Sequence, residues 1–169
     1  MIVALTGFMG CGKSSVGRAL AQLRGCAFID LDEYIVHKAG DTIRTIFERD
    51  GQWRFRALEA EAVRDIITLR EFSGDTGDLV LALGGGTFTL APIRKLLLDK
   101  CKCVFLEASP ESIRQHLAAG SNPQSRPLLQ EADIDALLEE RTQYYAECPV
   151  KVVTDGRTVL EIAADLVNL

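Results

Sequence analysis

Short apolar runs alternate along the chain with longer stretches in which apolar residues recur every three or four positions. A continuous apolar run of about four to eight residues is typical of a strand buried on both faces, and the longer period is typical of an amphipathic helix. Because the two patterns alternate throughout, we expect an α/β fold in which an open, mostly parallel, five-stranded sheet has helices on both faces. The runs interpreted as strands are 2–5, 26–30, 79–83, 103–106 and 150–153.

Capping signals mark where several helices begin and end. Gly40 and Gly51 follow short helical patterns and are expected to end them. A long amphipathic helix is predicted after Gly51, ending before a loop at 73–78. Thr158, with Glu161 three residues later, forms a capping box for the last helix. Further helices are expected behind the first strand and over 33–39, 92–98, 109–118 and 133–146.

The size and charge of the chain exclude several classes of partner. With 169 residues, 47% of them hydrophobic, we expect one domain spanning residues 1–169. The net charge of −5 excludes broad electrostatic attraction to nucleic acid or to an anionic membrane. The first strand begins at residue 2 with no signal peptide before it, and no apolar run approaches the roughly 20 residues of a membrane span. We therefore expect a cytoplasmic monomer whose partners are small molecules.

The cysteines and histidines add no chemistry to this picture. The five cysteines, at positions 11, 26, 101, 103 and 148, form no metal-ligand grouping with either histidine, and we interpret them as small hydrophobic residues. His37 and His116 are isolated on predicted helices and are interpreted as ordinary surface or packing residues.

The stretch Gly7–Ser14 fits the phosphate-binding pattern of Gly, four residues and Gly-Lys-Ser, placed where a strand leads into a helix. Glycines allow backbone N–H groups to approach phosphate oxygens, and the helix N-terminus adds partial positive charge. Lys13 can reach the β- and γ-phosphates of ATP, and the Ser14 hydroxyl can ligate Mg²⁺. The alternative is a glycine-rich turn with a surface lysine. The residues predicted to bind the nucleotide here are Gly10, Cys11, Gly12, Lys13, Ser14 and Ser15.

Two carboxylates follow the second strand, at the edge of the sheet where ligands bind in open α/β folds. The strand at 79–83 ends in glycine and supplies no acid, so Asp30 is the candidate partner of Mg²⁺; the alternative is that Asp30 only caps the next helix. Asp30 and Asp32 alternate across Leu31, so both can face one cleft. Asp32 can then orient an acceptor hydroxyl and take its proton during in-line phosphoryl transfer.

The chain resembles the shikimate kinases, which transfer the γ-phosphate of ATP to the 3-hydroxyl of shikimate in the route to chorismate and the aromatic amino acids. The resemblance implies a P-loop kinase-type fold with an acceptor-binding segment at 33–60 and a lid loop at 119–130. Six motifs carry it, in this order and over nearly the whole chain: Gly-x-Met-Gly-x-Gly-Lys-Ser, Asp30-x-Asp32, Phe55-Arg56-x-x-Glu59, Gly84-Gly85-Gly86, Arg126-Pro127-Leu128 and Arg141.

The resemblance also implies a role for each matching residue. Arg56 and Arg141 hold the shikimate carboxylate, Glu59 helps to fix Arg56, and Asp32 with the glycines Gly84, Gly85 and Gly86 holds the hydroxyls. Arg126 swings over the γ-phosphate, so the expected catalytic residues are Lys13, Asp32 and Arg126, and Arg157 stacks on adenine. Taken singly, each of these arginines could also be a solvated surface residue, and Arg56 with Glu59 an exposed ion pair.

Two other functions remain open from the sequence. Another small-metabolite kinase, such as a gluconate kinase, would also bind a carboxylate and hydroxyls. A nucleotide-sensing module would bind ATP without an acceptor, but it would not need an acid at the position of Asp32.

Overall fold

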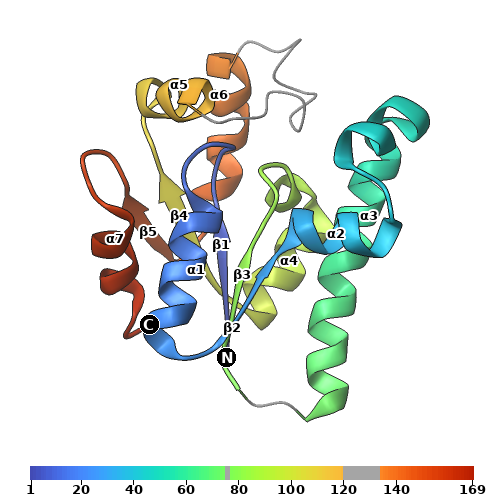
Figure 1. Ribbon diagram of the computed structural model, residues 1–169, viewed down its shortest axis with the longest axis horizontal. Helices are drawn as coiled ribbons and strands as arrows, with labels where there is room; N and C mark the ends of the chain where they lie inside the picture. The colour runs from blue at the N-terminus through green and yellow to red at the C-terminus, as the bar shows by residue number, and fades with distance from the viewer. Residues whose placement is uncertain (75–76, 120–133) are drawn as a thin grey trace.

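The computed structural model describes residues 1–74, 77–119 and 134–169. Their strands form one five-stranded, fully parallel sheet in the order β2-β3-β1-β4-β5 (Figure 1). This arrangement confirms the predicted fold class. The strands are β1 (Ile2–Thr6), β2 (Ala27–Asp30), β3 (Leu79–Ala82), β4 (Lys102–Glu107) and β5 (Val150–Val153).

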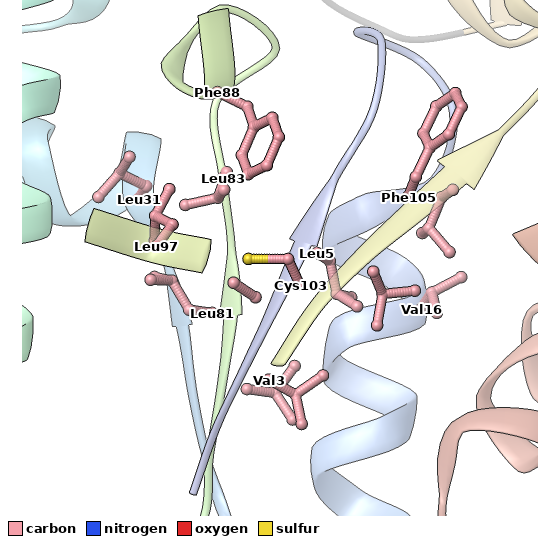
Figure 2. Packing of buried hydrophobic residues seen from close by; sticks show 14 of the residues in the cluster. Val3, Leu5, Val16, Leu31, Leu81, Leu83, Phe88, Leu97, Cys103 and Phe105 are labelled. Carbon is pink, nitrogen blue, oxygen red and sulfur yellow. The ribbon is translucent and has the colours of Figure 1, made fainter. Parts of the chain in front are cut away.

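Helices cover both faces of the sheet. Right-handed crossovers place α1 (Lys13–Arg24) on one face, where it packs beside α7 (Val159–Leu166), and place α3 (Ile43–Ser73) and α4 (Ala91–Lys100) on the other (Figure 1). Figure 2 shows apolar side chains of β1, β3 and β4 packed together with Val16 of α1 and Leu97 of α4. The central strands are buried on both faces, which explains their continuous apolar runs.

The remaining elements gather at the carboxyl edge of the sheet. They are α2 (Leu31–Ala39), the short 3₁₀ helix η1 (Thr87–Thr89), α5 (Pro110–Ala119) and α6 (Ile134–Tyr145) (Figure 1). The sequence did not predict η1, which is only three residues long and lies between the glycine turn and α4. Because each loop that leaves a strand opens at this edge, the predicted site residues are brought to one end of the molecule.

Local signals explain most helix boundaries. Thr158 and Glu161 form the predicted capping box, and Thr42 caps α3. Gly51 lies inside the span of α3 with φ 79° and ψ 174°, so it breaks the helix into two segments, as its position in the sequence predicted. The predicted start of α2 at residue 33 was wrong: the helix begins at Leu31, because the Asp30 side chain already caps it.

Some predictions fall on residues that the structure does not describe. Arg126 and all but the first residue of the predicted lid at 119–130 lie outside the described residues, as do two residues of the loop at 73–78. Within the described parts of the chain, no helix is long and apolar enough to cross a membrane.

Candidate functional site

The loop between β1 and α1 has the backbone of a phosphate-binding loop. Gly7, Gly10 and Gly12 have φ angles of 143°, 83° and 94°, values that residues with a Cβ rarely adopt. A Cβ at Gly7 would also lie 2.5 Å from the Leu106 carbonyl oxygen, so glycine is needed there for space as well. The loop ends at Gly12, the N-cap of α1. The backbone N–H groups of the loop therefore lie next to the N-terminus of the helix, whose partial positive charge favours binding of a phosphate.

Lys13 is drawn into this loop and is only 9% exposed. Its ammonium group donates hydrogen bonds of 2.9 Å to the carbonyl oxygens of Gly7 and Phe8. The Cys11 side chain is buried beside it, 3.9 Å from the Lys13 nitrogen. The alternative of a surface lysine on a glycine-rich turn is therefore wrong.

Asp30 uses its two carboxylate oxygens for different purposes. Oδ2 accepts a 2.5 Å hydrogen bond from the Ser14 hydroxyl, and Oδ1 accepts from the backbone N–H groups of Asp32, at 3.0 Å, and Glu33, at 3.4 Å. Asp30 thus caps α2 and also accepts from the Ser14 hydroxyl, and its role as a partner of Mg²⁺ stays a prediction.

A cavity of about 350 Å³ lies in front of the phosphate-binding loop. Asp32 reaches it from the first turn of α2, rather than from the end of the strand as the sequence suggested, and Gly85 reaches it from the turn after β3. The cavity thus joins the phosphate-binding loop to Asp32 and Gly85, whereas the predicted acceptor-side residues Arg56, Gly84, Gly86 and Arg141 do not line it. Of the predicted residues, those that line it are Gly10, Gly12, Lys13, Ser14, Ser15, Asp30, Asp32 and Gly85.

The environment of Asp32 makes it an unusually weak acid. Burial and the negative charges of Glu59 and Asp30, partly opposed by the positive charges of Lys13 and Arg56, together raise the pKa of its carboxyl to about 6. Asp32 Oδ1 is buried without a hydrogen-bond partner among the described residues. A buried, unpaired carboxylate oxygen with a raised pKa has the chemistry of a proton acceptor.

Arg56 and Glu59 form a buried ion pair on α3. Glu59 is fully buried, and the Arg56 side chain is 14% exposed. The pair lies against the glycine turn, where a Cβ would stand 2.6 Å from Glu59 Oε1 at Gly84 and 2.1 Å from a guanidinium nitrogen at Gly86. The alternative of an exposed ion pair is therefore wrong, and glycine at these two positions leaves room for the pair.

Arg141 is buried on α6, which excludes the alternative of a solvated helix residue. Its guanidinium lies over the ring of Phe8, and one of its nitrogens has no hydrogen-bond partner in the described structure. Burial lowers its pKa, and the nearby positive charge of Arg56 lowers it further. Both guanidinium groups approach the glycine turn, Arg141 beside Gly85 and Arg56 beside Gly86, and such a pair of positive charges can attract an anion.

Arg157 and His116 have contacts that the sequence did not predict, and the stacking of Arg157 on adenine stays a prediction. Arg157 does not line the cavity: its guanidinium donates to Asp165, at 2.6 Å, and to the Glu161 carbonyl oxygen, at 3.2 Å. His116, predicted to be an ordinary helix residue, lines the cavity, and its Nδ1 lies 2.9 Å from the Gly10 carbonyl oxygen. An isolated histidine on a helix carries no sequence signal of such a contact.

A phosphate-binding loop that faces a buried acid, with two guanidinium groups beyond it, defines a P-loop kinase of a small metabolite. A family model described as shikimate kinase matches residues 9–169. The chain therefore belongs to the shikimate kinase family, which confirms the resemblance seen in the sequence.

Individual relatives agree with this assignment. The chain is 43% identical over 170 residues to a shikimate kinase from Thermus thermophilus, across 98% of this chain and 88% of that protein. It is also similar to the solved structure of shikimate kinase from Acinetobacter baumannii in complex with shikimate, with a TM-score of 0.84, 31% identity and coverage of 99% and 90% of the two chains. A gluconokinase from Sinorhizobium meliloti has a TM-score of 0.55 at 19% identity, covering 98% and 89%, which shows a shared fold alone.

Proposed function

We propose that this protein transfers the γ-phosphate of ATP to the 3-hydroxyl of shikimate. The observation that carries the proposal is the cavity that Lys13 and Asp32 share. Lys13 binds the phosphates and stabilises charge on the transferring group, and Asp32 accepts the proton of the attacking hydroxyl. Membership of the shikimate kinase family and the similarity to a shikimate-bound structure support this choice of acceptor.

The acceptor is held from two sides. Arg56 and Arg141 bind its carboxylate, since their guanidinium groups lie beside the adjacent glycines Gly86 and Gly85 and one nitrogen of Arg141 has no hydrogen-bond partner among the described residues. Asp32 and the backbone at Gly85 hold its hydroxyl groups at the cavity wall, while Gly84 and Gly86 give the turn its close packing. The acceptor-binding segment at 33–60 therefore acts together with the glycine turn and α6.

Ser14 and Asp30 are the residues that would hold Mg²⁺. Their hydroxyl and carboxylate oxygens are 2.5 Å apart and are the hard donors that this ion prefers. The described residues contain no cluster of three or more histidine, cysteine, aspartate or glutamate side chains that could hold a metal, so the phosphate oxygens would complete the coordination. When bound, Mg²⁺ neutralises charge on the β- and γ-phosphates.

A phosphorylation assay with alternative acceptors tests the proposed function. We expect ADP release, coupled to NADH oxidation, to depend on shikimate and to be absent with gluconate or with no acceptor. Release with gluconate alone would favour the other class of small-metabolite kinase. Nucleotide binding without transfer to either acid would indicate a sensing module.

The raised pKa of Asp32 predicts a pH dependence. Because the folded-state pKa is about 6, Asp32 is mostly protonated at pH 5 and cannot accept a proton, so activity should fall on the acid side. We expect carboxyl ¹³C NMR of the nucleotide-free protein to show a midpoint near 6 for Asp32. The Asp32→Asn spectrum identifies the resonance by its absence. A midpoint near the ordinary aspartate value of about 3.9 would contradict the prediction.

A further inference from the structure

Glu59 has two carboxylate oxygens, and each has a different partner. Oε2 accepts from the guanidinium of Arg56, three residues earlier on α3. Oε1 accepts a 2.6 Å hydrogen bond from the hydroxyl of Thr87, which is the first residue of η1. Because Glu59 is fully buried, no solvent replaces either partner if it is lost.

The bond between Thr87 and Glu59 joins two parts of the site that are 28 residues apart in sequence. One is the helix that carries Arg56, and the other is the glycine turn whose middle residue, Gly85, lines the cavity. Thr87 is fully buried, and its backbone N–H donates to the Gly84 carbonyl oxygen at 3.2 Å, which fixes the residue to the turn. The hydroxyl is therefore held where it donates to the carboxylate of Glu59.

Close packing leaves Glu59 little freedom other than rotation of its carboxylate. A Cβ at Gly84 would lie 2.6 Å from Glu59 Oε1, 2.9 Å from Thr87 Oγ1 and 3.0 Å from Asp32 Oδ1, so these side chains are crowded around the glycine. A Cβ at Gly86 would clash in the same way with the guanidinium group of Arg56. The orientation of the Glu59 carboxylate then decides where the Arg56 guanidinium lies, because the two groups are hydrogen-bonded to each other.

We propose that Thr87 is a positioning residue for the acceptor: its hydroxyl orients Glu59, and Glu59 in turn holds Arg56 in place to bind the carboxylate of the substrate. The inference rests on the proposed function, because it assigns Arg56 to the acceptor. Thr87 acts on Arg56 through Glu59 and makes no hydrogen bond to Lys13 or Asp32 among the described contacts. Its loss should therefore change binding of the acceptor and not the chemical step.

The test removes the hydroxyl and keeps the shape. For Thr87→Val we expect the KM for shikimate to rise about tenfold, as expected for loss of a hydrogen bond to a charged group, with kcat and the KM for ATP almost unchanged. Thr87→Ser restores the hydroxyl and should restore the KM. Thr154→Val is the matched control, since it removes another buried threonine hydroxyl, bonded at 3.0 Å to the Glu107 carbonyl oxygen, and should leave the KM for shikimate unchanged.

A double-mutant cycle separates positioning from a general weakening of the fold. If Thr87 acts through Arg56, adding Thr87→Val to Arg56→Ala should cause no further rise in the KM for shikimate; independent effects would multiply and would overturn the proposal. An unchanged KM in Thr87→Val, or a parallel loss of kcat and ATP affinity, would also overturn it. If Thr87→Val does not fold, the KM for shikimate is compared between Thr87→Ser, which has the hydroxyl, and Thr87→Ala, which lacks it. If neither Thr87→Val nor Thr87→Ala folds, the role of Thr87 is structural and the proposal is overturned.

Wild-type protein in the same assay keeps this proposal distinct from the proposed function. If wild type fails to phosphorylate shikimate, the proposed function is wrong. If wild type is active and Thr87→Val is indistinguishable from it, only the role of Thr87 is wrong.

Discussion

Asp32→Asn should lower kcat by about 10³-fold or more while ATP binding survives. The amide keeps the shape of the carboxylate but cannot take a proton from the acceptor hydroxyl. The buried oxygen of Asp32 without a partner and the raised pKa of its carboxyl both indicate that this group acts as the base. Single-turnover phosphorylation of shikimate and calorimetric titration with a non-hydrolysable ATP analogue measure the two effects separately.

The neighbouring acid provides a control for Asp32→Asn. Glu33 is exposed on the same helical turn, forms an ion pair with Arg18 and does not line the cavity, so Glu33→Gln should leave kcat unchanged. If Asp32→Asn lost ATP affinity in step with activity, Asp32 would belong to the nucleotide side of the site and the proposed mechanism would fail.

For Lys13→Met we expect a fall in kcat of about 10²-fold or more, together with weaker ATP binding. The ammonium group is held at the phosphate-binding loop by the Gly7 and Phe8 carbonyl oxygens, so its charge is preorganised near the phosphates. Steady-state kinetics at saturating shikimate give both parameters.

Lys38→Met is the corresponding control, because Lys38 lies on the surface of α2 and forms ion pairs with Glu61 and Asp65. Its loss should change stability slightly and catalysis not at all, since exposed ion pairs contribute little to stability. A Lys13→Met enzyme with wild-type kcat would show that the loop binds phosphate through its backbone amides alone.

The alternation of apolar runs and helical patterns was enough to predict the sheet, because every strand is short, apolar and separated from the next by a helix. The phosphate-binding loop was predictable for a similar reason, since its chemistry depends on local glycine spacing. The start of α2 could not be predicted in this way. Asp32 lies on the helix because the carboxylate of Asp30 caps α2 directly after β2. The spacing of residues in the sequence does not show that the Asp30 side chain both caps α2 and accepts a hydrogen bond from Ser14.

Long-range contacts set the limit of prediction for the acceptor side. Arg56 and Arg141 come from helices far apart in sequence, and only the fold shows that the half-buried Arg56 and the buried Arg141 both lie beside the glycine turn. Thr87 carries no motif, and its bond to Glu59 depends on a 3₁₀ turn that is too short to predict. The contact of His116 with Gly10 likewise depends on the packing of α5 against the loop.

The crowding around Gly84 and Gly86 limits how enzymes with this arrangement can diversify. Any larger residue at either position would displace Glu59 or Arg56, so mutation there removes function before it can create a new specificity. A descendant enzyme that accepts a different alcohol would have to acquire its new contacts from α2, α3 and α6. The turn is therefore the part of the site where substitution is sterically most restricted, and the helices are the part with room for change.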